Sequence, residues 1–185
     1  GTTQTSRLLQ SGNKHLRVFY TTVDLTNPYV KIRAVSGTDM MAGGETVSQM
    51  CKRKTEPGQR YYVGVNGDFW LTRGTTGRGQ SVVGTPIGTS MAKGVVYKGV
   101  NGVEIQYSID ANQVPTIGYV NFGGTIVGAN GTVNIGGVNT DTPNNTVGIY
   151  NPTYFKGTNQ SNVTEVQVRY VDGDDSFAFG KPCKL

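Results

Sequence analysis

The residues best suited to chemistry lie in the stretch YYVGVNGDFWLTRG, from Tyr61 to Gly74. The Asp68 carboxylate can accept hydrogen bonds from hydroxyl groups or act as an acid or base. The Asn66 amide can donate to a phosphate or sugar oxygen. Trp70, the only tryptophan, offers a broad ring face for stacking on a sugar. These residue types predict a polar binding site with Asn66 and Asp68 as catalytic candidates.

A second interpretation of the same residues is a plain tight turn. Asn-Gly is the commonest signal for a turn with positive φ, so Asn66 and Gly67 could simply form such a turn and have no role in binding. Phe69 and Trp70 follow at once, however, and they are bulky for a solvent-exposed tip. Binding groups also tend to lie on loops that leave a buried strand. Both interpretations stay open, with Gly67, Phe69 and Trp70 as candidate substrate-binding residues.

The following loop, Arg73 to Gly79, places two arginines among glycines. Glycines let backbone N–H groups approach an anion, and arginine binds phosphate through two hydrogen bonds. Arg73 and Arg78 are therefore candidate phosphate ligands, with a solvated loop as the alternative. The phosphate-binding signature Gly-x-x-x-x-Gly-Lys-Ser/Thr is absent.

Other catalytic arrangements have weaker support. The single histidine, His15, lies in a polar opening segment, and no Gly-x-Ser-x-Gly motif occurs. No spacing of Cys or His predicts a metal site, and nothing calls for a cofactor. Cys51 and Cys183 could form a disulfide or remain two buried thiols, and the sequence does not decide. Carboxylates that could form a pair are Asp24, Asp68, Asp110 and Glu165.

The elements that must position these residues predict a β-rich α+β fold. The 185 residues fit one domain, expected at 16–185 after a polar lead-in at 1–15. The spacing of Val47, Met50, Cys51 and Lys54 at i, i+3, i+4 and i+7 predicts the one main helix, near residues 45–55. Short antiparallel strands separated by Gly-rich turns are expected at 95–100, 103–109, 117–122, 132–135, 147–150 and 176–179.

Four further segments are predicted as strands. Residues 16–25 and 29–35 are expected to form a hairpin with one solvated face. Residues 61–65 are expected to be a strand that is buried on both faces, leading into Asn66. Residues 163–171 alternate again and predict a later strand.

The charge balance limits the classes of partner. Seventeen Lys and Arg against twelve Asp and Glu give a net charge of +5, which could favour an anionic ligand. The basic residues are scattered, so nucleic-acid binding is not expected. No apolar run approaches the ~20 residues that a membrane-spanning helix needs.

The order of four motifs resembles the phosphodiester glycosidase family. The motifs are TTVDLTNPYVKIRAV (21–35), YYVGVNGDFW (61–70), GTPIGTSMAKGVVY (84–97) and TVGIYNPTYFKGTNQSNVTEVQVRY (146–170). In the family a strand ends in Asn-Gly-x-Phe and a Gly-x-Pro-x-Gly return segment follows. Asn66, Gly67 and Phe69 match that motif, whereas Asp68 falls on its variable position.

The resemblance implies hydrolysis of a sugar-1-phosphodiester by a secreted, periplasmic or cell-surface protein. The family's C-terminal Arg-x-Ala-Ile/Val-Gly and Asp-Gly-Gly-Gly-Ser segments are absent here. The chain is therefore expected to be the N-terminal portion of such a hydrolase, acting with a downstream domain. The alternative is a non-catalytic carbohydrate- or surface-binding module on the same scaffold.

Overall fold

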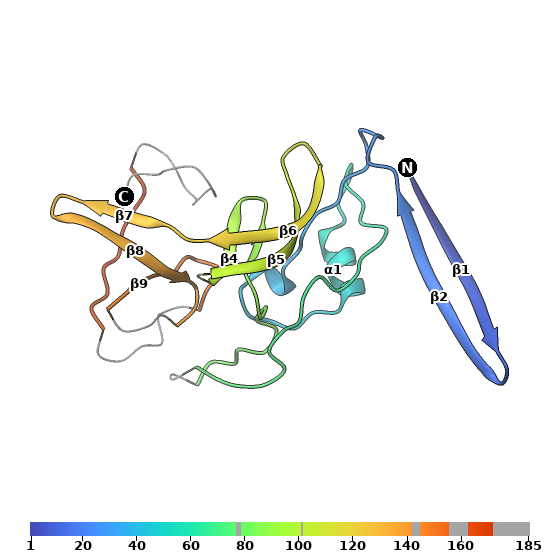
Figure 1. Ribbon diagram of the computed structural model, residues 1–185, viewed down its shortest axis with the longest axis horizontal. Coiled ribbons are helices and arrows are strands. Elements are labelled where there is room, and N and C mark those ends of the chain that lie inside the picture. Colours follow the sequence, from blue (N-terminus) through green and yellow to red (C-terminus); the bar gives the residue numbers. More distant parts are fainter. Residues whose placement is uncertain (77–78, 101, 142–144, 156–162, 172–185) are drawn as a thin grey trace. The chain divides into compact units, whose positions relative to one another are not determined.

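The computed structural model describes residues 1–76, 79–100, 102–141, 145–155 and 163–171 (Figure 1). The chain forms two compact units, of which the first comprises Gly1–Arg33 and Tyr107–Thr116 and the second the rest. The elements are β1 (Thr2–Ser11), β2 (Lys14–Val23), η1 (Gly37–Asp39), α1 (Val47–Lys54), β3 (Ser90–Ala92), β4 (Val95–Val100), β5 (Gly102–Ile109), β6 (Pro115–Phe122), β7 (Thr125–Gly128), β8 (Gly131–Val138) and β9 (Val147–Ile149). The predicted β-rich α+β class is confirmed.

The first unit contains a two-stranded ribbon in which β1 pairs antiparallel with β2 along their whole length. The expected loose lead-in at 1–15 is therefore wrong, because these residues form β1 and the start of β2. Gly12 closes the turn with a φ of 56°. Polarity concealed the strand, since a ribbon exposed on both faces needs no apolar alternation. Residues 29–35, the expected hairpin partner, form no strand.

Helix α1 begins at a capping box, and its half-buried face is the predicted one. The Thr46 hydroxyl accepts from the Gln49 N–H, and the Gln49 side chain accepts from the Thr46 N–H. Such a capping box satisfies backbone donors that the first helical turn leaves unpaired. The predicted stripe Val47, Met50, Cys51 and Lys54 is half-buried, and the other helical residues are exposed.

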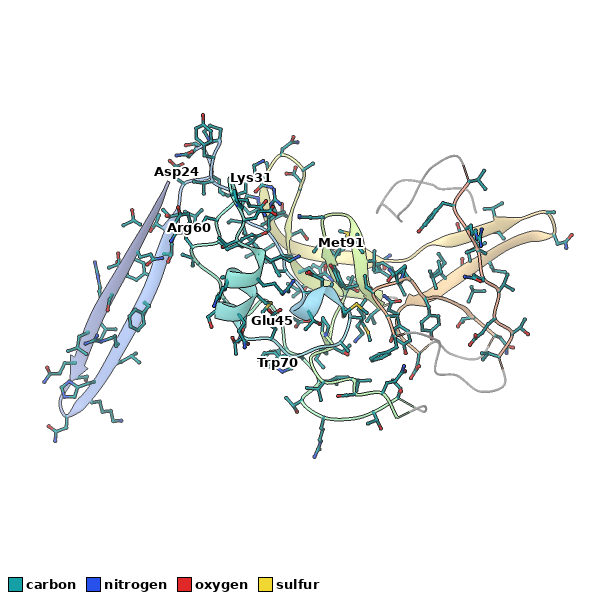
Figure 2. All side chains as sticks on the ribbon, turned by 180° about the vertical axis from the view of Figure 1, so that it is seen from behind. Asp24, Lys31, Glu45, Arg60, Trp70 and Met91 are labelled. Carbon is teal, nitrogen blue, oxygen red and sulfur yellow. The ribbon has the colours of Figure 1, made fainter. Side chains whose placement is uncertain are left out.

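An ion-pair network ties α1 to the segment before it, as Glu45 beside the helix in Figure 2 illustrates. The Arg53 guanidinium donates to the carboxylates of Asp39 and Glu45, and the Lys54 ammonium lies 2.7 Å from Asp39. Hydrogen bonds from Arg53 and from the Thr38 N–H lower the pKa of Glu45 to about 2. The network fixes the direction from which the chain enters the helix.

The second unit is organised around β8, which pairs with three other strands. Its first half forms a hairpin with β7, and its second half pairs with β4 and, in parallel, with β9. β3 extends this sheet beyond β4, while β5 and β6 form a separate two-stranded sheet. The predicted strands at 95–100, 103–109, 117–122, 132–135 and 147–150 are all present, whereas 176–179 lies outside the described residues.

The core of the second unit is small and close-packed. Val96, Phe122 and Val138 are buried together, with Ile135 and Ile149 against them. The Phe122 ring lies directly over Gly99, where a side-chain carbon would come within 2.3 Å of the ring. A glycine at this point of β4 is what lets the aromatic ring reach the sheet.

Beside this core lies a buried polar side chain, Asn139, which directly follows β8 and is 1% exposed. Its Nδ2 lies 2.8 Å from the Tyr97 carbonyl and 2.9 Å from the side-chain oxygens of Asn151 and Thr153. Its own oxygen accepts from the Asn151 N–H. Asn151 in turn donates to the Val96 carbonyl at 2.7 Å. The two asparagines thereby join β4 to the chain that follows β8 and β9.

Two further predicted strands do not form in the described residues. Residues 61–65 are largely exposed, and they lie in no sheet. Gly64 instead packs on α1, where a side-chain carbon would come within 2.5 Å of Val47. Residues 163–171 are also mostly exposed, without strand pairing. Strand propensity gives an extended backbone, but a strand also needs a neighbour with which to pair.

Replacing Asn139 with alanine should lower the free energy of unfolding by about 3 kcal/mol. The change leaves the Asn151 N–H and the Tyr97 carbonyl without their partner, and alanine tolerates the backbone φ of 53° poorly. Urea unfolding measures the effect, with the exposed β8 variant Asn134→Ala as control. Equal stability of the two variants would contradict the assigned network.

Replacing Glu45 with glutamine should remove a pH-dependent part of the stability. A folded-state pKa of about 2, below the usual 4.5, stabilises the fold above pH 4.5 and loses that effect as the pH falls toward 2. The melting temperature of Glu45→Gln should therefore lie below that of the parent at pH 7 and approach it near pH 2. A constant difference across this range would exclude the ion pair.

Candidate functional site

Two of the motifs singled out in the sequence lie side by side in the second unit. The Ile87 N–H donates to the Phe69 carbonyl at 2.9 Å, and Leu71 exchanges hydrogen bonds with Thr85 and Gly84. Trp70 and Pro86 form a bridge between the two antiparallel segments. The Asn-Gly-Asp-Phe element and the Gly-x-Pro-x-Gly return segment therefore form one local structure.

Gly84 allows this return segment to lie close to the glycines before α1. Its φ is 89°, and a side-chain carbon there would come within 2.5–2.8 Å of the backbone of Gly43 and Gly44. The Gly43 N–H donates to the Val83 carbonyl at 2.9 Å, next to this contact. Only glycine fits both the backbone conformation and the space.

Asp68 connects the two segments through its carboxylate. One oxygen accepts from the N–H of the next residue, Phe69, at 2.7 Å, and the other accepts from the Gly88 N–H at 3.2 Å. The contact with Gly88 spans twenty residues of sequence. Asp68 therefore ties the return segment to the Asn-Gly-Asp-Phe element. Its side chain is also exposed to solvent.

Lys98, on β4, holds the same segment from another side. Its half-buried ammonium group donates to the carbonyl oxygens of Pro86 and Ile87, both at 2.7 Å. Burial lowers the pKa of Lys98, and the nearby carboxylates of Asp68 and Glu104 oppose that shift. An ammonium group has three N–H donors, so one remains for a ligand.

Glu104, on β5, completes the arrangement. Its Oε2 accepts from the Thr89 N–H at 2.8 Å and from the Gln106 side chain at 3.1 Å. The Thr89 hydrogen bond holds the pKa of Glu104 below its ordinary value, against the opposing effect of burial. Glu104 therefore acts as an acceptor at neutral pH rather than as a proton donor.

We call Asp68, Lys98, Glu104 and the backbone of residues 86–89 the Asp68–Glu104 cluster. Two carboxylates bind successive N–H groups of this backbone, at Gly88 and Thr89, and an ammonium group binds the two preceding carbonyls. Carboxylate acceptors beside a cationic donor suit the hydroxyl groups of a sugar. Unpaired lone pairs on both carboxylates remain available for such contacts.

Aromatic side chains lie beside the cluster. Phe69 and Trp70 are 84% and 46% exposed, and Ile87, opposite Phe69, is 50% exposed. Trp70 is labelled in Figure 2. Exposed aromatic rings next to polar groups are typical of binding surfaces, because they bury apolar area on contact with a ligand.

The remaining predicted residues are placed as follows. Asn66 and Gly67 are exposed. Neither residue lies in a turn, and neither has a positive φ. The plain tight-turn interpretation is therefore wrong, because the nearest change of chain direction is a bend at Asp68. Arg73 is exposed and makes no hydrogen bond to the cluster, and Arg78 lies outside the described residues.

Metal, disulfide and membrane features add no second site. Among the described residues no group of three or more His, Cys, Asp or Glu side chains could hold a metal ion. Cys51 is half-buried on α1, and Cys183 lies outside the described residues, so their pairing stays a prediction. In the described part of the chain no helix has the length and apolarity to cross a membrane.

Sequence reasoning missed Lys98 and Glu104. The available signal was the alternation of β5, in which Glu104 and Gln106 share one face and Val103 and Ile105 the other. The structure half-buries the polar face and exposes the apolar one. This inversion arises because Glu104 has a specific partner, the Thr89 N–H.

Comparisons with protein-family models, with curated proteins and with solved structures found no match.

Replacing Glu104 with glutamine should lower the melting temperature at pH 7 and have little effect in acid. Because the pKa of Glu104 is lowered on folding, its carboxylate stabilises the fold above the usual value of 4.5. That contribution is lost as the pH falls through the lowered folded-state pKa. Thermal unfolding at several pH values measures this, with the exposed Asp141→Asn as control. A deficit that persists at the lowest pH would contradict the Glu104–Thr89 bond.

Proposed function

We propose that the chain recognises a sugar-1-phosphodiester at the Asp68–Glu104 cluster and serves its hydrolysis. The observation that carries the proposal is the contact between the Asn-Gly-Asp-Phe element and the Gly-x-Pro-x-Gly segment. Both motifs belong to the resemblance to phosphodiester glycosidases. The hydrogen bonds between the two motifs support that resemblance, because they bring two carboxylates and an ammonium group together.

The chemistry of each group fits a sugar ligand. Asp68 and Glu104 accept hydrogen bonds from ring hydroxyls, and the third N–H of Lys98 donates to a hydroxyl or phosphate oxygen. Trp70 or Phe69 provides an aromatic face for the ring. Asn66 and Arg73, both exposed, are assigned to the phosphate, and Arg78 has the same proposed role.

The reaction breaks the bond between C1 of the sugar and the phosphate oxygen. Water adds to C1, a proton leaves that water, and the phosphate departs as a monoester on its other substituent. Carboxylates near C1 stabilise the positive charge that develops on the ring in the transition state. A phosphate monoester is a stable leaving group and needs no strong acid.

A second candidate is a non-catalytic carbohydrate-binding module on the same scaffold. It is favoured by the hydrogen bonds that already occupy Asp68 and Glu104, because these carboxylates organise the backbone of 86–89. Both candidates place the protein outside the cytoplasm, as a secreted, periplasmic or cell-surface component. A downstream domain of the same protein is the proposed partner in catalysis.

The direct test offers an N-acetylglucosamine-1-phosphodiester to the 185-residue chain. Calorimetry measures binding, and release of free sugar measures turnover. Asp68→Asn and Asn66→Ala should each weaken binding about tenfold or more, since each removes a polar contact of ~1.5 kcal/mol or more. Asn66→Ala should leave stability within ~0.5 kcal/mol, because the residue is exposed and outside any turn.

Asp141→Asn, an exposed carboxylate away from these contacts, is the matched control. Turnover that the two site variants lose supports the hydrolase. Saturable binding without turnover supports the module. Absence of both binding and turnover would contradict the proposed function.

A further inference from the structure

The ribbon of β1 and β2 is built differently from the rest of the protein. Its ten-residue strands pair without a bulge, from Thr2 opposite Val23 to Ser11 opposite Lys14. Figure 1 shows the two long antiparallel arrows, and no further described strand pairs with either. An isolated two-stranded ribbon is marginally stable in water. We therefore expect such a long ribbon to be stabilised by a surface that it binds.

The register divides the ribbon into two faces. Directly opposite residues share a face, so Leu9, Leu16, Val18 and Tyr20 lie together with Arg7 and Lys14. The Arg7 guanidinium lies 5.8 Å from the centre of the Tyr20 ring, which agrees with this assignment. The other face carries Leu8 and Phe19 together with Arg17.

Both faces expose apolar side chains that nothing in the ribbon covers. Leu9 and Leu16, a directly opposite pair, are 51% and 61% exposed, and Phe19 is 73% exposed. Exposed apolar residues that cluster on one element are typical of contact surfaces. An aqueous polyanion would leave Leu9 and Leu16 in water, so it does not account for their exposure.

The charge of the ribbon has a single sign. Arg7, Lys14 and Arg17 are its charged residues, and residues 1–23 contain no Asp or Glu. Basic side chains interleaved with exposed apolar ones complement a surface that is anionic outside and apolar beneath. Among biological partners that description belongs to an anionic lipid bilayer.

We propose that the β1–β2 ribbon lies flat on an anionic lipid surface. Leu9, Leu16, Val18 and Tyr20 enter the boundary between headgroups and acyl chains. Arg7 and Lys14 contact the phosphate groups of the lipids, with their aliphatic stems over the apolar layer. The binding is peripheral and reversible, and it does not depend on the proposed sugar site.

The test measures co-flotation of the full chain with phosphatidylcholine vesicles that do or do not contain phosphatidylglycerol. Binding should occur only to the anionic vesicles and should weaken with added salt. Arg7→Gln/Lys14→Gln should bind roughly 30-fold less tightly, since each basic residue contributes several-fold. The control Lys31→Gln/Arg33→Gln removes two exposed cations outside the ribbon and should bind nearly as the parent does.

A second variant, Leu9→Thr/Leu16→Thr, tests the apolar contact. Threonine keeps the strand propensity, so far-ultraviolet circular dichroism should not change, and binding should fall at least about tenfold. Vesicle binding that survives this change would reduce the ribbon to a general polyanion contact and overturn the proposal. Failure to float with anionic vesicles, or equal affinity for soluble heparin, would also overturn it.

Discussion

The second unit depends on one buried amide group, that of Asn139. Its side chain is almost fully buried and lies within hydrogen-bond distance of Tyr97, Asn151 and Thr153. A buried polar group is costly when unpaired, so this arrangement favours one relative placement of β4 and the chain after β9 over all others. The apolar core around Phe122 is small, and the polar network supplies the specificity that so few apolar side chains cannot.

The placement of β4 then determines the geometry of the candidate site. Tyr97 presents its carbonyl to Asn139, and the next residue, Lys98, directs its ammonium group to the backbone of 86–89. The same backbone presents consecutive N–H groups to Asp68 and Glu104. A short segment is thus held from three elements. Such rigidity is what a binding site needs in order to limit the entropy lost when a ligand is ordered.

Local chemistry predicted part of this from the sequence. The stripe of α1 follows from apolar periodicity, and strands β4 to β6 follow from short runs of strand-forming residues between turn signals. Asp68 was identified from its place beside Asn-Gly. Glu104 and Lys98 were missed because their roles depend on partners that are distant in sequence, at Thr89 and Pro86. β1 was missed because polar strands lack a periodic signal. The strand predicted at residues 61–65 does not form, because strand propensity does not specify a pairing partner.

The most direct measurement is a pH titration of backbone amide shifts by nuclear magnetic resonance. If Glu104 holds the return segment, the Thr89 amide proton should titrate in acid. The midpoint should lie below 4.5, as the lowered pKa of Glu104 requires. Glu104→Gln should abolish this titration, whereas Asp68→Asn should change the Gly88 amide shift and leave the Thr89 titration in place. A Thr89 amide shift that does not titrate, or that titrates unchanged in Glu104→Gln, would contradict the account.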